Sequence, residues 1–192
     1  SLLGSGYVSS RITHKKTITF SALAVGIAIS FISVSNSLFA MRCCIFLLGV
    51  SAGLYLPSGI TAITSLVDPK HWGKAVSIHE LAPNLSFLLA PLLAEIFLQR
   101  LVWCNIYFLV GIGSIIMGLT FARFGKGGNF LGEAPNFSSI KPILDVPAFW
   151  ILIVLFSLAI ASTLGIYNML PLYLVTEHGI SREWANSLVS IS

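Results

Sequence analysis

Long runs of residues without a charged side chain constrain this sequence more than any other feature. Residues 17–34 carry no charge over 18 positions, and residues 43–67 carry none over 25. About 20 apolar residues, at a rise of about 1.5 Å per residue, are enough for a helix to cross the hydrocarbon core of a bilayer. The two runs are preceded by the basic segment 6–16 and joined by the small polar residues 35–37, so they predict a membrane-spanning hairpin.

The rest of the chain continues this pattern. The sequence is 56% hydrophobic and 9% charged, with a mean hydropathy of +0.90, which would leave a soluble domain with too little polar surface. Further spans are predicted at 75–98, 101–122 and 146–175, and a last apolar segment begins at 184 and is cut short. We therefore predict an all-α polytopic membrane protein with five complete transmembrane helices and the start of a sixth, and expect the chain to be a piece of a larger protein.

The distribution of Lys and Arg predicts how the spans are oriented, because short cytoplasmic loops are enriched in these residues. Loops 1–16, 67–74 and 123–145 are therefore predicted to be cytoplasmic, in the plasma or inner membrane of a cell. This bias explains the net charge of +4, so we expect anionic lipid as a neighbour and no nucleic acid. The cytoplasmic group is Arg11, Lys15, Lys16, Lys70, Lys74, Arg123, Lys126 and Lys141, against Arg42, Arg100 and Arg182 on the outer side.

Cysteine and histidine positions give no sign of a metal site, a cofactor or an intramembrane nucleophile. Three cysteines lie in or beside apolar segments, and four histidines are scattered over loops and span ends without metal-type spacing. We therefore expect no metal, no cofactor and no enzyme activity. A channel is disfavoured because the outer connections 35–37 and 99–102 are too short for a filter loop. A non-transport membrane protein, such as an assembly factor or membrane enzyme, stays the alternative to a transporter.

Segment 6–16 reads GYVSSRITHKK and matches a known cytoplasmic motif, G-x-x-x-D-R-x-G-R-R/K, in Gly6, Arg11 and the basic end. Ser10 stands where Asp is usual and Thr13 where Gly is usual. Three further signals accompany it: the small-residue stretch GVSAGLYLP at 49–57, the basic turn DPKHWGKA at 68–75, and Trp103 at the start of a span. With these signals the chain resembles the middle of a major facilitator superfamily transporter.

The resemblance implies a bundle of two six-helix halves that rock against each other around a central cavity. By this correspondence, residues 1–122 hold helices three to six of the first half, 123–145 form the linker, and 146–192 begin the second half. The expected function is transport of a small solute by alternating access, with protons as a candidate coupling ion and a lean to organic or inorganic anions. We expect the full-length protein to be a monomer whose partners are the solute and the bilayer.

By the same correspondence, residues 38–67 are helix four and residues 146–175 are helix seven, which are repeat-equivalent in the resembled family. Gly and Pro residues occur at corresponding places in these two helices, and helix breaks at such places indicate a binding site. Polar groups can line a cavity there, since non-helical backbone in a membrane needs protein or water to satisfy it. The alternative is that the helices are kinked and pack without touching substrate. The predicted breaks are Gly53, Pro57, Gly165 and Pro171, with Pro91 from a segment resembling the fifth-helix antiporter motif; the predicted pathway residues near them are Tyr55, Asn84, Tyr167 and Asn168.

Arg42 is a further candidate for the substrate pathway. It lies near the outer end of an otherwise uncharged span, where a guanidinium at mid-depth costs about 2.5–3.5 kcal/mol on insertion scales. The alternative is that Arg42 extends to the outer interface.

His79 and Glu80 fall about one turn into the span 75–98 from its cytoplasmic side and are the candidates for proton coupling, because imidazole and carboxylate groups can exchange protons at low dielectric. Adjacent residues lie about 100° apart around a helix, so we do not expect both to face one partner. The alternative is an interfacial pair that caps the helix. For the basic loop, the expectation is a cytoplasmic gate that holds helix ends together, formed by Gly6, Arg11, Lys15 and Lys16.

Overall fold

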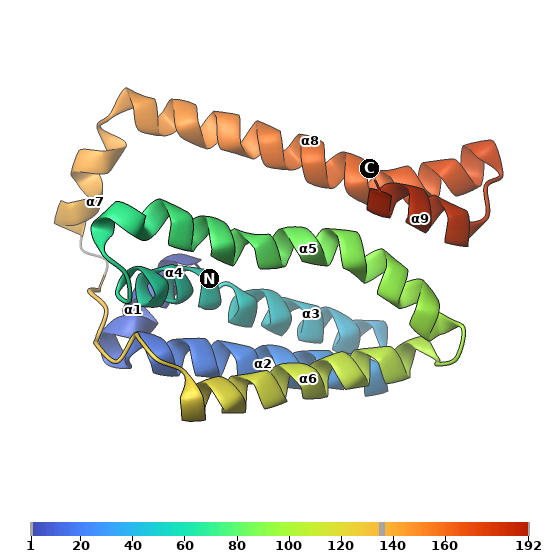
Figure 1. Ribbon diagram of the computed structural model, residues 1–192, viewed down its shortest axis with the longest axis horizontal. Helices are drawn as coiled ribbons and strands as arrows, with labels where there is room; N and C mark the ends of the chain where they lie inside the picture. The colour runs from blue at the N-terminus through green and yellow to red at the C-terminus, as the bar shows by residue number, and fades with distance from the viewer. Residues whose placement is uncertain (1, 135–136, 192) are drawn as a thin grey trace. The chain divides into compact units, whose positions relative to one another are not determined.

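The computed structural model of the chain describes residues 2–134 and 137–191 (Figure 1). Its helices group into two compact units. Unit 1 comprises Ser1–Leu81 and Arg100–Pro135, and unit 2 comprises Ala82–Gln99 and Asn136–Ser192. The boundary between them falls inside the long helix α5 (Trp72–Leu98). These units are defined by which residues are close together in space. The predicted division into 1–122 and 146–192, joined by the linker 123–145, rests on the family resemblance and stays a prediction.

Within the described residues, five helical segments are long and apolar enough to cross a membrane: His14–Val34, Leu38–Thr64, Pro69–Leu98, Trp103–Phe124 and Pro147–His178. The prediction of an all-α polytopic membrane protein is confirmed. The elements are α1 (Leu2–Arg11), α2 (His14–Val34), α3 (Leu38–Ala52), α4 (Tyr55–Thr64), the 3₁₀ turn η1 (Pro69–His71), α5, α6 (Trp103–Phe124), α7 (Phe137–Leu144), α8 (Pro147–His178) and α9 (Arg182–Ile191).

Segment 1–16 is not the loop that we predicted, because Leu2–Arg11 forms helix α1. Its polar residues are satisfied within the helix: the Ser10 hydroxyl donates to the Tyr7 carbonyl at 2.7 Å, and the Arg11 guanidinium donates to the Tyr7 hydroxyl at 3.0 Å. Thr13 then ends the connection as the N-cap of α2, where its hydroxyl accepts from the Lys16 backbone N–H. The predicted linker 123–145 likewise contains a helix, α7.

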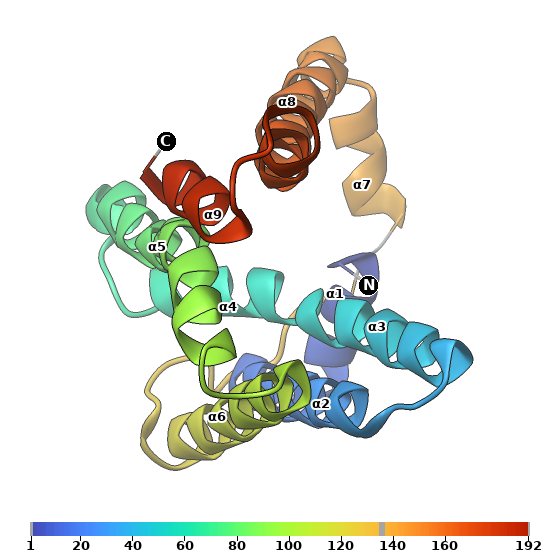
Figure 2. The same cartoon turned by 90° about the vertical axis from the view of Figure 1, so that its right-hand side faces the viewer.

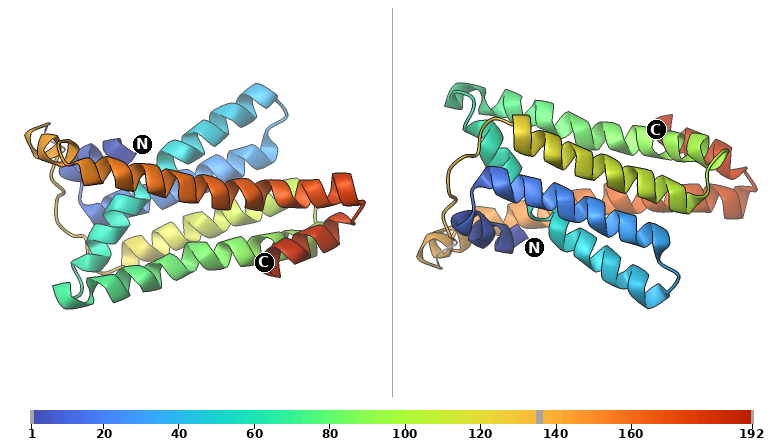
Figure 3. Two further views of the ribbon diagram at one scale, coloured as in Figure 1. Left: turned by 90° about the horizontal axis from the view of Figure 1, so that it is seen from above. Right: turned by 90° about the horizontal axis from the view of Figure 1, so that it is seen from below.

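In unit 1, helices α2 and α6 lie side by side (Figure 2), and α3 lies along α2 on the other side (Figure 3). The backbones of α2 and α6 approach closely at Gly26 and Gly111: a Cβ added at Gly26 would lie 2.6 Å from the Gly111 carbonyl oxygen. The Ser114 hydroxyl donates across the same interface to the Ala22 carbonyl at 2.9 Å. Lipid tails are as apolar as the helices, so close packing of small residues and interhelical hydrogen bonds hold such a pair together.

Between α3 and α4 the chain leaves the helix at Gly53 and Leu54, where a break was predicted. The Ser51 carbonyl freed there accepts from the Leu54 N–H at 3.2 Å and from the buried Ser21 hydroxyl of α2 at 2.7 Å. Pro57 lies in the first turn of α4, where its missing N–H removes no helical hydrogen bond.

The predictions of helix breaks at Pro91, Gly165 and Pro171 are wrong, because these residues do not interrupt their helices. Helix α5 continues through Pro91, and α8 continues through Gly165 and Pro171. An internal proline removes one backbone hydrogen bond, but the remaining bonds of a long apolar helix are kept, because leaving them unmade in a membrane would cost several kcal/mol each.

Candidate functional site

Three predicted residues of unit 1 form a chain of polar contacts between two spans. Tyr55 begins α4 directly after the break at Gly53 and Leu54, and its hydroxyl lies 2.9 Å from the His79 Nε2 of α5. The two rings stack at a centroid distance of 5.8 Å and an interplanar angle of 22°. On its other side, His79 Nδ1 lies 3.2 Å from Glu80 Oε1. The structure therefore brings together one predicted pathway residue and both candidates for proton coupling.

If Glu80 is ionised and His79 is neutral, the contacts assign the proton of the imidazole to one of its two nitrogens. An ionised carboxylate only accepts hydrogen bonds, so Nδ1 donates to Glu80. In a neutral imidazole the other nitrogen is then an acceptor, so the Tyr55 hydroxyl donates to Nε2. Every group in this chain can bind or release a proton. The His79 side chain is 13% exposed and that of Glu80 is 46% exposed, so the imidazole is the enclosed middle member.

Our expectation that His79 and Glu80 would not share a partner needs one adjustment. Their Cα–Cβ bonds do diverge around α5, but the Glu80 carboxylate bends back to contact the His79 ring.

An apolar cavity of about 370 Å³ lies beside Tyr55 in unit 1. Helices α2, α4 and α6 form its walls, and Lys126 lies at its rim just after α6. Gly59, one turn after Tyr55, passes under the phenol ring, where an added Cβ would lie 3.2 Å from the ring. The lining residues are Ile18, Ala22, Tyr55, Gly59, Ala62, Ile63, Leu66, Met117, Gly118, Phe121 and Lys126.

Next to the start of α2, the segment 128–132 is hydrogen-bonded to two helices of unit 1, α1 and α2. The Lys15 N–H donates to the Gly128 carbonyl at 2.9 Å and the His14 N–H to the Phe130 carbonyl at 3.2 Å. These carbonyls satisfy backbone donors of the first turn of α2, which have no partner within a helix. The Gly132 N–H also donates to the Ser9 carbonyl at 2.8 Å. This part of the predicted linker 123–145 is therefore docked on unit 1.

His14 anchors the docked segment through its side chain. The ring is buried, its Nδ1 lies 3.2 Å from the Ser58 hydroxyl of α4, and it packs against the Phe130 ring at 5.1 Å between centroids and an interplanar angle of 62°. The predicted gating residues surround this point, but their side chains do not converge: Arg11 contacts Tyr7 of its own helix, and Lys16 is exposed.

Three other predicted pathway residues, Arg42, Tyr167 and Asn168, are not members of this chain of contacts. Arg42 is exposed on α3 and makes no hydrogen bond or ion pair with any residue that the structure describes. In unit 2, the Tyr167 hydroxyl donates to the Phe87 carbonyl of α5, and their rings meet edge to face at 5.4 Å. The Asn168 amide donates to Leu164 of its own helix at 2.7 Å, and Asn84 is exposed on α5.

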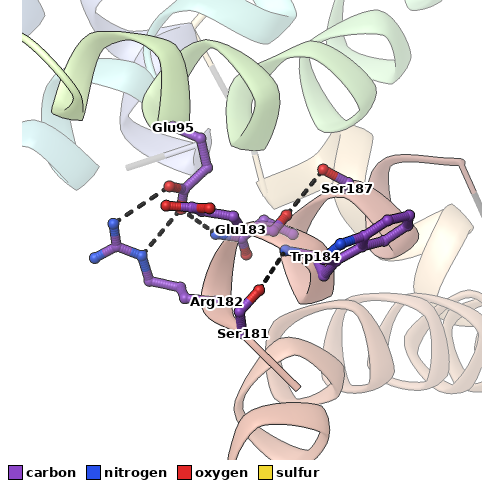
Figure 4. Close-up of polar contacts among 7 residues, drawn as sticks. Glu95, Ser181, Arg182, Glu183, Trp184 and Ser187 are labelled. Atoms are coloured by element: carbon purple, nitrogen blue, oxygen red, sulfur yellow. Dashed lines mark hydrogen bonds and ion pairs between the residues drawn. The ribbon is translucent and has the colours of Figure 1, made fainter.

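Sequence reasoning missed one polar cluster of unit 2, formed by Glu95 of α5 with Arg182 and Asn186 of α9 (Figure 4). The available signal was that Glu95 and Arg182 have opposite charges. Their contact depends on how the two helices are rotated, which a single sequence does not specify.

The five apolar spans of the described residues, a helix pair packed through small residues, and ionisable side chains joined between spans define a polytopic α-helical membrane protein. The family model described as Major Facilitator Superfamily matches residues 1–192. The chain therefore belongs to the major facilitator superfamily, whose members are integral membrane transporters of small molecules and not enzymes. No curated protein and no solved structure matches it.

Proposed function

We propose that this protein moves a small solute across the plasma or inner membrane by alternating access, and that proton movement through Tyr55, His79 and Glu80 is coupled to this transport. The observation that carries the coupling is the unbroken contact from the Tyr55 hydroxyl through both nitrogens of His79 to the Glu80 carboxylate. Ionisable residues inside spans are costly and typically mark substrate or proton paths.

The position of Tyr55 connects this chain to a helix movement. Tyr55 follows the only interruption between Leu38 and Thr64 and also borders the apolar cavity, so a change in the break would move the phenol relative to His79. Loss of the Tyr55–His79 contact would free Nε2 to take a proton from water. Proton uptake by His79 and the conformation of α4 are thereby linked, which is what coupling requires.

For the solute we propose an organic or inorganic anion. Arg42 supports this, because it is a permanent cation within a span and has no anionic partner among the described residues. We further propose that residues 1–122 and 146–192 belong to different halves joined by 123–145, with loops 1–16, 67–74 and 123–145 cytoplasmic, because Lys and Arg accumulate in these loops.

Transport by membrane vesicles containing the protein tests the proposal. Uptake of labelled anions, sugars and hydrophobic cations is measured with and without an imposed proton gradient, alongside solute exchange at zero gradient. We expect Glu80→Gln and His79→Asn to abolish gradient-driven accumulation of an anion while exchange continues, because exchange requires no net proton movement. Tyr55→Phe, which keeps the ring but removes the hydroxyl, is expected to reduce accumulation about tenfold, the effect of losing about 1.4 kcal/mol.

His71→Asn is the matched control, since His71 is exposed in η1 at the same end of α5. Accumulation that survives both Glu80→Gln and His79→Asn at normal protein levels would refute the coupling role. Absence of flux for every compound, in vesicles where a known transporter works, would favour the non-transport alternative.

A further inference from the structure

We propose that Glu95, Arg182 and Asn186 form an outer gate, which holds the outer side of the transport pathway closed and separates when that side opens. This inference rests on the proposed alternating-access function, and none of the sequence motifs identified it.

The cluster has the geometry of a strong charge-assisted contact (Figure 4). Arg182 Nε lies 3.1 Å from Glu95 Oε1, and Arg182 Nη2 donates to Oε2 at 3.2 Å. The guanidinium therefore engages both carboxylate oxygens, which adds orientation to the attraction. The Asn186 amide donates to Oε1 at 2.6 Å, so Glu95 receives three contacts from α9.

The turn before α9 fixes the position of Arg182. Gly179 ends α8 with φ +61°, a left-handed conformation that favours glycine, and the Ile180 N–H returns to the Leu174 carbonyl at 3.2 Å. Ser181 then caps α9: its carbonyl accepts from the Ala185 N–H at 2.9 Å and its hydroxyl from the Trp184 N–H at 3.4 Å. Arg182 is thus the first residue of α9, and Asn186 lies one turn later on the same face.

The burial of the pair suits a contact that must open. The Glu95 side chain is 13% exposed, whereas that of Arg182 is 63% exposed. An enclosed carboxylate with three donors holds the closed state, while the open side of the guanidinium lets water replace it at modest cost. A fully buried pair would resist separation, because its parting would leave uncompensated charges in the protein.

The place of the cluster in the chain makes it a gate. Glu95 lies in the last turn of α5, within the proposed first half, and Arg182 and Asn186 belong to the proposed second half. Rocking of the halves must change this contact. Glu95 also lies about 22 Å along α5 from Glu80. One helix would therefore carry His79 and Glu80, proposed for proton coupling, near its cytoplasmic end and Glu95 of the gate at its outer end.

Labelling of a reporter cysteine in membrane vesicles tests the gate. Leu88→Cys, two turns inward of Glu95 on the same face of α5, is introduced after replacement of Cys43, Cys44 and Cys104 by serine. A membrane-impermeant maleimide is applied from the outer side. We expect Arg182→Gln and Glu95→Gln to raise the labelling rate about tenfold, and Asn186→Ala about threefold, because each variant shifts the population toward the outward-open state.

Matched control variants distinguish opening of the gate from a general effect of removing a charge near the ends of these helices. Arg100→Gln and Glu183→Gln remove exposed charges near the same ends of the helices, and both are expected to leave labelling unchanged. The double variant Glu95→Arg with Arg182→Glu restores the opposite charges and is expected to return labelling to within about threefold of the parent rate.

Unchanged labelling in both single variants, at normal protein levels, would overturn the gate. So would a double variant that stays as open as the single ones. The flux measurements described above judge transport separately. Flux with unchanged labelling refutes the gate alone, whereas increased labelling without flux of any compound supports the gate contact and counts against the proposed function.

Discussion

The close approach of α2 and α6 at Gly111 gives the sharpest test of the packing. A Cβ at Gly111 would lie 2.3 Å from the Ser30 hydroxyl, 2.8 Å from the Gly26 carbonyl oxygen and 2.9 Å from the Ser30 backbone nitrogen. The hydroxyl can rotate away, but the two backbone atoms cannot. Gly111→Ala therefore forces the helices apart.

The size of this effect follows from the distances. The Gly26 oxygen would be about 0.6 Å closer than ordinary van der Waals contact, which begins at 3.4 Å. Moving the helices apart by that distance forfeits about a quarter to a half of the dispersion energy of each facing pair of atoms. It also stretches the hydrogen bond from Ser114 to the Ala22 carbonyl, worth about 0.6 kcal/mol in membranes. We expect a total destabilisation of about 1–3 kcal/mol.

Gly113→Ala provides a matched control in the same helix. No atom lies within 4 Å of a Cβ added at Gly113, so the substitution costs no packing and adds helix propensity of up to about 1 kcal/mol. The assay is the denaturant midpoint of the purified protein in mixed detergent micelles. We expect the midpoint to fall for Gly111→Ala and to stay or rise for Gly113→Ala. Equal midpoints would refute the close-packing argument.

Two further predictions concern the polar contacts of unit 1. Ser21→Ala removes one donor from the Ser51 carbonyl at the break between α3 and α4, and we expect it to lower the free energy of unfolding by about 0.5–1.5 kcal/mol in the same assay; an unchanged midpoint would mean that Leu54 alone satisfies this carbonyl. His14→Ala removes the anchor of segment 128–132, and we expect trypsin to cleave after the exposed Lys126 about fivefold faster, with His71→Ala as control. Equal cleavage rates would show that the backbone contacts of Lys15 and Ser9 hold the segment without the ring.

Some predictions from the sequence failed where local signals were read in isolation. Residues 1–16 were predicted as a loop, but Leu2–Arg11 is helical, and the Ser9 and Ser10 hydroxyls bond to carbonyls of the preceding turn, which is compatible with helix α1. Pro91 and Pro171 suggested breaks, but their helices are continuous, whereas Gly53 and Leu54 do interrupt a span. Ser21, on a different helix, satisfies the Ser51 carbonyl at that interruption.

The sequence by itself determined the number and the approximate positions of the spans among the described residues, because hydropathy and helix length are properties of contiguous residues and the bilayer sets the length required. Only the tertiary structure decided which polar groups meet. Tyr55 and His79 are 24 residues apart, and Glu95 and Arg182 are 87 apart. Their contacts depend on the rotation and register of whole helices, which are set by packing such as that of Gly26 on Gly111.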